Sequence, residues 1–506
     1  MLSKTGLWEY MVKVFLSERR NKMSIKDALA KIVGKENVSD TAEDLQLYAK
    51  DLSLLPSGMA DAVVWPGSSE EVGKVVAYCN ENNIPVVPVS SRTHLYGSSI
   101  PKQGGVVVDM KRMTKILEID KDNRLARFEA GVTWSQYCAA LKEQGMRTIM
   151  PLLPRPDRSV LSDTLDRAVP TNIVYDYGEP TQSLEITWAD GSIFRCGSAS
   201  VNGFPDSKSR GANPSGPGLD FYRFMQGSQG TMGIVNWMSA KIEHQTKIDK
   251  IFFAPVADLE YANTFLHRIL PRRVGQECLL LNNVDLAAII ADKAEDFDAL
   301  AAKLPPWTLI LTISGVMRRP EEKIAVEEKF LTEVLRGEFT DLPLSDKLPG
   351  FPGLGRKLLP LLRAPWPADV KYWKDRLRGG VQDIFYITRP GKAKEQVAIM
   401  DAIAAKNGYP IADIGKYIQP IEHNRAAQVE FSLFYNPEDE QEKAMVAKIN
   451  REAALALMNA GAFFSRPYGE IAEVVYDRAA SYTMTLKRVK KVFDPNNIMN
   501  PGNLCF

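Results

Sequence analysis

A loop held between two apolar runs constrains the fold of this chain more than any other stretch. Residues 88–99, with the sequence PVSSRTHLYGSS, follow the apolar residues 84–87 and precede the apolar residues 105–109. Such runs predict buried strands, and loops between buried strands often carry a ligand, usually with glycines that let the backbone approach it. This loop has a single glycine, Gly97, and carries three larger side chains, Arg92, His94 and Tyr96. The loop is therefore a candidate ligand site.

The first half of the chain mixes short strands with helices. Residues 68–83 begin with a Ser-x-x-Glu capping box and continue as an amphipathic run, which predicts a helix. Residues 106–109 and 115–130 predict strands, and residues 132–145 predict a helix that ends at a glycine. Residues 183–197 predict a hairpin with Asp-Gly at its turn. This half of the chain is therefore expected to be α+β.

The pattern changes near residue 246. Residues 342–367 are rich in proline and predict a long surface excursion, and the chain ends in DPNNIMNPGNLCF. Longer helical runs alternate with strands here, the helices at 320–336, 392–407 and 437–460 and the strands at 307–314 and 428–435. The change in texture predicts a second α+β domain.

Composition excludes several functional classes. The 506 residues suggest two or three domains, and 63 Lys+Arg against 62 Asp+Glu leave no basic field for nucleic acid. The five cysteines show no C-x-x-C spacing, so no zinc or iron–sulfur site is expected. No apolar run approaches the ~20 residues of a membrane span. We expect a protein of a reducing compartment, cytoplasmic or peripheral at a membrane.

The N-terminus carries an amphipathic stretch within residues 1–22. In GLWEYMVKVFLSERR, apolar residues recur at helical spacing, with charged residues on the opposite stripe. One interpretation is a helix packed on its own domain. The other is a helix that docks on a partner chain, forming a homo- or hetero-oligomer, or on a membrane surface.

Several segments together resemble the vanillyl-alcohol oxidase and 4-cresol dehydrogenase family of FAD-linked oxidoreductases, with an FAD-binding domain of the PCMH type. They occur in the family's order: KIVGKENV, AVVWPGSSEEV, VVVDMKRMTKILEID, GVTW, RSVLSDTLDRAV, SLEITWADG, GTMGIV and DPNNIMNPG. The resemblance implies an FAD-binding domain of two α+β subdomains at residues 1–245. It implies an inserted α+β cap domain at 246–484 and a tail at 485–506 that returns to the FAD domain.

The resemblance also implies that FAD is the cofactor and that the loop from Pro88 to Ser98 lies along its pyrophosphate. Two adjacent phosphates need several N–H donors, which consecutive loop amides supply. RSVLSDTLDR resembles a second flavin-binding segment, and GTMGIV resembles the strand beside the adenine. The residues expected to bind FAD are Val89, Ser90, Ser91, Arg92, Thr93, His94, Ser98, Ser159, Ser162, Asp163, Asp166, Gly233, Ile234 and Val235.

For the substrate, Tyr96 and Arg466 correspond to residues that bind a phenolate in similar proteins. A phenol ionises near pH 10, so its anion needs a cation and donors beside it. The family's partner tyrosine is replaced by Ser465, with Tyr468 nearby, and Arg466 equally suits a carboxylate held in a bidentate fork. Asp157 is the acid nearest to the position of a carboxylate beside flavin N5, which aligns with Pro154 itself. The expected catalytic residues are Tyr96, Arg466, Asp157 and Tyr468, with Glu430, Glu470 and Glu473 as further candidate acids.

Two positions bear on covalent attachment of FAD. Gln428 and Val429 stand where the cap strand would need a histidine, so attachment through the cap is not expected. His94 offers another route, because a different branch of the superfamily attaches FAD through a histidine in this loop. The alternative is that His94 only forms hydrogen bonds beside the cofactor.

The expected activity is transfer of hydride from a para-substituted phenol, or from an aryl or other alcohol, to flavin N5. One alternative is a 2-hydroxy-acid dehydrogenase acting on a substrate such as glycolate or D-lactate. The other is a flavin electron-relay subunit of a larger complex. In each case the ligand is a small organic molecule, and an electron-accepting protein or a quinone reoxidises the flavin unless O₂ does.

Overall fold

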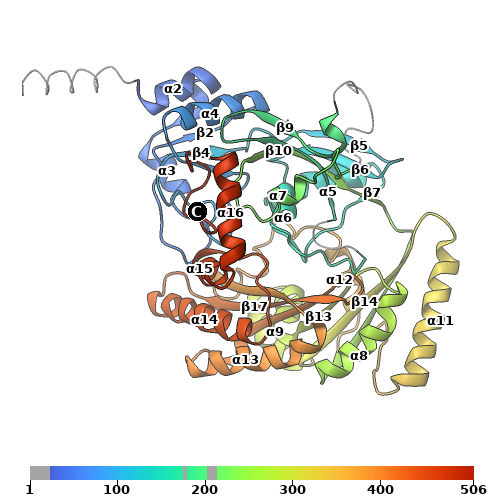
Figure 1. Cartoon of the computed structure of the whole chain (residues 1–506). Coiled ribbons are helices and arrows are strands. Elements are labelled where there is room, and N and C mark those ends of the chain that lie inside the picture. Colours follow the sequence, from blue (N-terminus) through green and yellow to red (C-terminus); the bar gives the residue numbers. More distant parts are fainter. Residues whose placement is uncertain (1–22, 175–178, 202–212) are drawn as a thin grey trace, which may run out of the picture.

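The computed structural model describes residues 23–174, 179–201 and 213–506. The expected N-terminal helix within residues 1–22 lies outside this part of the chain. Figure 1 shows two layers of structure, the smaller sheets with α2 (Ile25–Val33), α3 (Ala42–Tyr48) and α4 (Ser69–Glu81) above and a larger sheet with its helices below. The fold is α+β throughout. Within the described residues, no helix is both long and apolar enough to cross a bilayer.

The first sheet holds the strands on either side of the opening loop. Its strand order is β1 (Val38–Ser39), β2 (Ala62–Val64), β4 (Val106–Asp109) and β3 (Val86–Val89). The last three strands run parallel, and α4 connects β2 to β3. The Ser68 hydroxyl caps α4 by accepting from the amide of Glu71 over 3.2 Å, as the capping pattern predicts.

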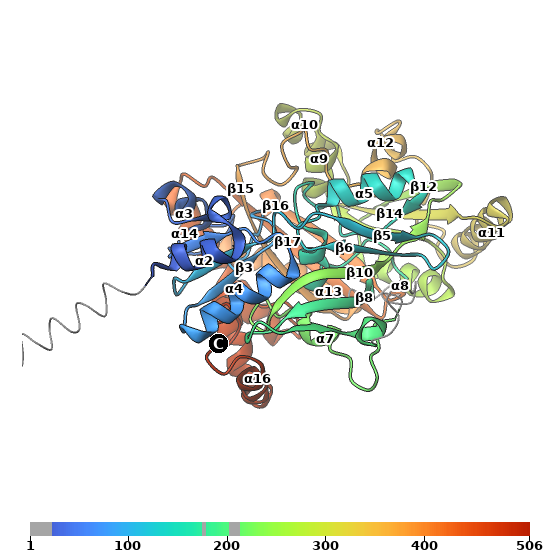
Figure 2. The ribbon, with the colours of Figure 1, turned by 90° about the horizontal axis from the view of Figure 1, so that it is seen from above.

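The second sheet is antiparallel and closes the expected FAD domain. Its order is β5 (Ile116–Asp120), β6 (Leu125–Glu129), β10 (Ile234–Lys241), β8 (Thr181–Thr187) and β9 (Ile193–Arg195). Its buried side chains form one core with those of the first sheet and with α5 (Trp134–Glu143). Figure 2 shows the second sheet from above, with α4 beside it. The short elements are β7 (Met146–Arg147), α6 (Val160–Leu165), α7 (Tyr222–Met225) and β11 (Glu243–His244).

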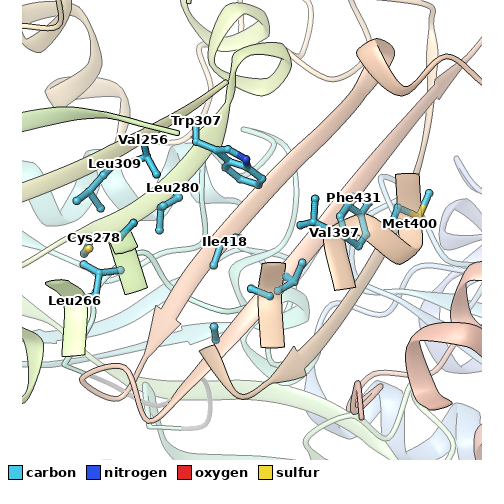
Figure 3. Close-up of a cluster of buried hydrophobic side chains, with 14 of the residues drawn as sticks. Val256, Leu266, Cys278, Leu280, Trp307, Leu309, Val397, Met400, Ile418 and Phe431 are labelled. Carbon is cyan, nitrogen blue, oxygen red and sulfur yellow. The ribbon is translucent and has the colours of Figure 1, made fainter. Parts of the chain in front are cut away.

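The third sheet is antiparallel and lies in the expected cap. Its order is β12 (Ile248–Val256), β14 (Trp307–Gly315), β13 (Cys278–Asn282), β16 (Ile414–Ile421), β17 (Ala426–Tyr435) and β15 (Gly380–Thr388). Helices cover both of its faces, because Leu280 packs in one core while Leu279 and Leu281 pack in another. The first core, shown in Figure 3, includes α8 (Leu259–Ile269), α11 (Pro320–Glu338), α13 (Ala393–Lys406) and α14 (Glu440–Asn459).

The opposite core contradicts one expectation. It contains α9 (Asn283–Ile290), α10 (Phe297–Lys303) and α12 (Leu354–Leu361), and α12 lies inside residues 342–367, which were expected to be a surface excursion. Leu354 and Leu358 of this helix are buried. The segment is therefore part of the cap core. Its prolines concealed the helix, whose one internal proline, Pro360, lies in the last turn.

The C-terminal segment returns to the first sheet. After α15 (Gly469–Arg478) and α16 (Ala480–Phe493), the tail forms a bridge between Met499 and Val86. The expected boundary at 484/485 divides α16, whose Phe493 packs on Trp188 of the FAD side at a ring distance of 4.7 Å. We therefore propose that the returning segment includes the whole of α16, and we keep the proposed cap start near residue 246.

Candidate active site

The opening loop lines a cavity together with α6 and the stretch that leads into β10. We call it the loop cavity. Ten of the residues expected to bind FAD line it: Val89, Ser90, Ser91, His94, Ser98, Ser162, Asp166, Gly233, Ile234 and Val235. The three segments that the sequence linked to one cofactor therefore come together in space.

The other four expected contacts lie elsewhere. Arg92 is exposed, with its guanidinium 5.7 Å from the ring centre of Tyr48, so it does not point into the loop cavity. Ser159 caps α6, and its hydroxyl donates to the carbonyl of Ala130. The carbonyl of Thr93 accepts from Arg158 over 3.2 Å. Asp163 accepts from Trp134 and pairs with Arg158, in a second cavity described below.

His94 is buried beneath the loop and lies between carboxylates. Its Nε2 lies 3.1 Å from Oδ2 of Asp166, and its Nδ1 lies 3.7 Å from Oδ2 of Asp51. Nδ1 also lies 3.3 Å from the backbone nitrogen of Tyr96. Burial lowers the pKa of His94, but its interactions with Asp166 and Asp51 outweigh burial and raise that pKa above its usual value. The two carboxylates therefore favour the protonated form of His94 beside the cavity.

The residues of the loop cavity fit a dinucleotide. The hydroxyl groups of Ser90, Ser91 and Ser162 line the cavity beside the backbone of the loop. Hydroxyl groups and backbone amides are suitable hydrogen-bond donors for phosphate oxygens. Gly230 has φ 73°, and an added Cβ would lie 2.4 Å from Pro88, so the backbone approaches closely here. The apolar lining is suited to stacking and packing of rings, and comes from Met110, Ala130, Leu161, Leu165, Met225, Ile234 and Val235.

A second cavity, the inner chamber, lies where the FAD side meets the cap. It is lined from the cap by β16, β17 and the segment 372–374, and from the FAD side by Tyr96, Pro151, Leu152, Pro154, Arg155 and Arg158. Four cations line it, Arg155, Arg158, Lys374 and Arg466, with four carboxylates, Asp163, Asp166, Asp383 and Glu430. The walls are therefore strongly charged in a largely buried space.

Three of the four cations are already paired. Arg155 forms a bidentate pair with Asp375 at 2.6 and 2.7 Å, and Arg158 pairs with Asp163 and with Asp166. Lys374 lies 2.8 Å from Asp383 and 2.7 Å from Glu430. Among the described residues, Arg466 alone of the four takes part in no ion pair. Its guanidinium is therefore available to an anionic group of a ligand.

Neutral groups hold Arg466. Its Nη2 donates to Oε1 of Gln428 over 3.0 Å, and the guanidinium lies 4.0 Å from the ring centre of Phe385. Gln428 in turn donates to Glu430 over 3.1 Å. The position where the cap could have supplied an attaching histidine thus orients the arginine instead.

Two tyrosines lie beside Arg466. Tyr96 and Tyr468 stack with ring centres 4.7 Å apart, and the Tyr96 ring meets Phe385 at 5.1 Å. Burial raises the pKa of both phenols well above 10, so both stay protonated and can donate. Tyr96, Tyr468 and Arg466 all line a third cavity, the outer chamber, and Tyr96 and Arg466 are shared with the inner chamber.

Asp157 does not join this group. It is exposed, whereas its neighbours Arg155 and Arg158 are buried and line the inner chamber. Glu470 lies on the outer chamber and pairs with Arg451, and Glu473 is exposed. Of the candidate acids, only Glu430 lines the inner chamber, and burial raises its pKa despite the pull of Lys374.

Lys374 is the main residue that sequence reasoning missed. It is 5% exposed, and its ammonium lies 5.2 Å from the ring centre of Trp373. Lysine is rarely buried without a partner, and both of its partners are distant in sequence. The one local signal was its place after two aromatic residues, Tyr372 and Trp373, inside an otherwise polar stretch.

Comparisons with known proteins match two segments of this chain to domains of FAD-linked enzymes. Residues 60–197 match the FAD binding domain, and residues 470–504 match the C-terminal domain of FAD linked oxidases. Glycolate oxidase subunit GlcD of Bacillus subtilis is 26% identical over 54% of this chain and 56% of its own. D-lactate dehydrogenase of Anaerostipes hadrus is 23% identical over 94% of both chains. The 4-cresol dehydrogenase flavoprotein subunit of Pseudomonas putida is 29% identical over 34% of each chain.

Solved structures show the same fold. That of p-cresol methylhydroxylase with substrate bound superposes with a TM-score of 0.82 and 19% identity, covering 95% of this chain and 96% of its own. The 4-ethylphenol oxidase of Gulosibacter chungangensis gives a TM-score of 0.80 at 19% identity, covering 94% and 96%. Both domains of the FAD linked oxidases are therefore matched in this chain, which is an FAD-linked oxidoreductase and shares the fold of p-cresol methylhydroxylase along nearly its whole length.

Proposed function

We propose that this enzyme oxidises a para-substituted phenol or a related aryl alcohol. The observation that carries the proposal is the unpaired Arg466 beside two protonated tyrosines on an aromatic wall. A phenolate oxygen placed there meets one cation and two O–H donors, which favour its ionised form. FAD, when bound, supplies the redox chemistry by accepting hydride.

The chain's own groups would perform three tasks. Arg466, Tyr96 and Tyr468 would bind and orient the oxygen of the substrate. Phe385 would pack on the substrate ring. With an aryl alcohol as substrate, Glu430 would take up the hydroxyl proton that is lost as the hydride leaves, because it lies on the inner chamber and burial raises its pKa.

The absorbance of a bound phenol tests this proposal directly. Ionisation of 4-ethylphenol shifts its ultraviolet band to longer wavelength, so the holoenzyme at pH 7.5 should show the phenolate spectrum on binding. Arg466→Ala should abolish the phenolate signal, whereas Arg425→Ala, at an exposed turn, should keep it. A bound phenol with an unshifted spectrum in the wild-type enzyme would contradict the proposal.

A 2-hydroxy acid is a second candidate substrate. Sequence similarity to a glycolate oxidase subunit and to a D-lactate dehydrogenase favours it, and Arg466 suits a carboxylate as well as a phenolate. The histidines offer little for this reaction. His94 is held by carboxylates, and His244, His267 and His423 are absent from the linings of both chambers.

We also propose an electron-accepting partner and a cytoplasmic location for this protein. The Pseudomonas putida relative is named a flavoprotein subunit, which supports an electron-accepting partner for this chain and an electron-relay role within a complex. A homo- or hetero-oligomer built through residues 1–22 remains our proposal for the assembly.

All five cysteines are free, in keeping with the cytoplasm. Among the described residues, no group of three or more His, Cys, Asp or Glu is placed to hold a metal.

A further inference from the structure

The outer chamber continues the site beyond Arg466. It shares Leu95, Tyr96, Asp383 and Arg466 with the inner chamber, so these side chains form the wall between the two spaces. Consider a phenol whose oxygen lies at Arg466 and whose reacting carbon lies in the inner chamber. The ring positions next to its oxygen would then face the outer chamber.

The walls of the outer chamber are mainly apolar. Leu54 and Leu55 come from the loop after α3, Ile384 and Phe385 from β15, and Phe464 and Ile471 from the segment around α15. The carboxylate of Asp383 is occupied by Lys374 and by the hydroxyl of Ser432. Burying an apolar group here is therefore favourable.

One polar atom in these walls has no partner among the described residues. Oδ1 of Asn450, on α14, is buried and has no hydrogen-bond partner within the described part of the chain. A buried acceptor without a donor is costly, and a ligand hydroxyl or N–H would remove that cost. Ala447, one turn earlier on the same helix, is exposed at the solvent side of the chamber.

We propose that the outer chamber is a second binding site for the substrate, which takes an apolar extension of several carbons attached next to the phenol oxygen and carrying a hydrogen-bond donor. The inference rests on the proposed function, because it places the phenol oxygen at Arg466. It narrows the substrate class from simple para-substituted phenols to phenols extended at position 2.

Calorimetric titration of the holoenzyme with phenol, 2-ethylphenol, 2-butylphenol and 2-hexylphenol tests the inference. These probes carry no carbon substituent para to the oxygen, so they offer no para side chain to oxidise and the heat reports binding. Each added CH₂ should tighten Kd by about threefold, somewhat less than full transfer from water would give. Ala447→Trp should remove this gain while leaving phenol unaffected. Ala444→Trp, on an exposed position of the same helix, is the control and should keep the gain.

The orphaned acceptor has its own test. In the wild type, 2-(3-hydroxypropyl)phenol should bind about as well as 2-butylphenol, because its hydroxyl meets Asn450. In Asn450→Leu, the hydroxyl-bearing probe should bind about tenfold more weakly than 2-butylphenol, as expected for a lost hydrogen bond. An unchanged ratio between the two probes would remove Asn450 from the proposed site.

The two proposals fail in different ways. If phenol itself does not bind, or binds equally well to Arg466→Ala, the proposed function is wrong. If phenol binds at Arg466 but Kd is independent of the length of the 2-alkyl group, the outer chamber does not hold the substrate. A loss of affinity in Ala447→Trp that is equal for phenol and 2-hexylphenol would overturn the inference in the same way.

Discussion

Arg466 and Gln428 are joined side chain to side chain, with Nη2 of the arginine 3.0 Å from Oε1 of the glutamine. The contact crosses from the segment before α15 to strand β17 of the cap sheet. Because Gln428 is neutral, it orients the guanidinium without cancelling its charge. The arginine is thereby presented, charged and positioned, at the wall between the two chambers.

Loss of this arginine should be severe. Arg466→Ala should lower kcat/KM for the best phenol substrate roughly 150-fold or more, which corresponds to a loss of ~3 kcal/mol of transition-state stabilisation. The substitution leaves a charged substrate oxygen without a partner in a site that excludes water. Gln428→Leu should cost about tenfold, since the guanidinium remains but loses its support. Steady-state kinetics with Arg425→Ala as the surface control measures both effects. A kcat/KM that barely changes in Arg466→Ala would show that the anchor is misassigned.

His94 should hold FAD without a covalent bond. Its raised pKa favours the protonated ring, which is not a nucleophile, and its Nε2 lies 3.1 Å from Oδ2 of Asp166. Acid precipitation of the wild type should therefore leave the flavin in the supernatant. Flavin that stays with the protein, and is released by His94→Ala, would establish attachment through this residue. Flavin bonded at Gln428 or Val429 would contradict the alignment of the cap strand.

The same histidine should make stability depend on pH. Its pKa is higher in the folded state than the unfolded value of 6.5, so its contribution is fully present below pH 6.5 and is lost as the pH rises through the folded pKa. His94→Ala should therefore lower Tm more at pH 6 than at pH 9. An equal fall in Tm at both pH values would contradict a titration of this ring between pH 6 and pH 9.

Asp285 should also make stability fall as the pH rises, but in a lower pH range. It is 1% exposed at the start of α9, and burial, opposed by Lys374, raises its pKa from 3.8 to about 7. The folded state therefore holds its proton more tightly, and stability falls as the pH rises from about 4 to about 7. Asp285→Asn should remove that slope and gain up to about 4 kcal/mol above pH 7. Tm values across this range check it, and identical pH profiles for the two proteins would contradict it.

Local patterns predicted the parts of the fold that local forces decide. The hairpin at 183–197 and the helix that begins after Ser68 follow from turn and cap residues within a few positions of each other. Helix α12 was missed because proline normally breaks helices, while packing of Leu354 and Leu358 on the cap core decided its state. Tertiary burial overrode the local preference there.

The site was harder to predict for the same reason. Lys374 is buried only because Asp383 and Glu430, 9 and 56 positions away, meet it across the cap sheet. Asp157 and Arg158 are adjacent, yet one is exposed and the other is buried against two carboxylates. Which neighbour points inward depends on the turn of the chain at 155–158, and no periodic pattern reports it. The resemblance to a family predicted the cofactor and the segments expected to bind it, whereas only the structure shows which charged side chains pair with one another.

The partner proposal predicts that residues 1–22 are dispensable for chemistry. A chain lacking them should bind FAD and reduce it with substrate at the wild-type rate, and should transfer electrons more slowly to a protein or quinone acceptor. Stopped-flow absorbance separates the two half-reactions, and size-exclusion chromatography compares the assemblies. Loss of folding in the shortened chain would show instead that this segment packs on its own domain.

The central claim is that FAD in this chain takes hydride from a phenol anchored at Arg466. The most direct test is to mix the holoenzyme anaerobically with 4-alkylphenols, aryl alcohols, glycolate and D-lactate and to follow the visible absorbance band of the flavin, because reduction bleaches that band without any acceptor. The account predicts rapid bleaching by 4-alkylphenols or aryl alcohols, slowed at least 100-fold in Arg466→Ala. Bleaching by glycolate or D-lactate alone would contradict it and would favour the 2-hydroxy-acid dehydrogenase.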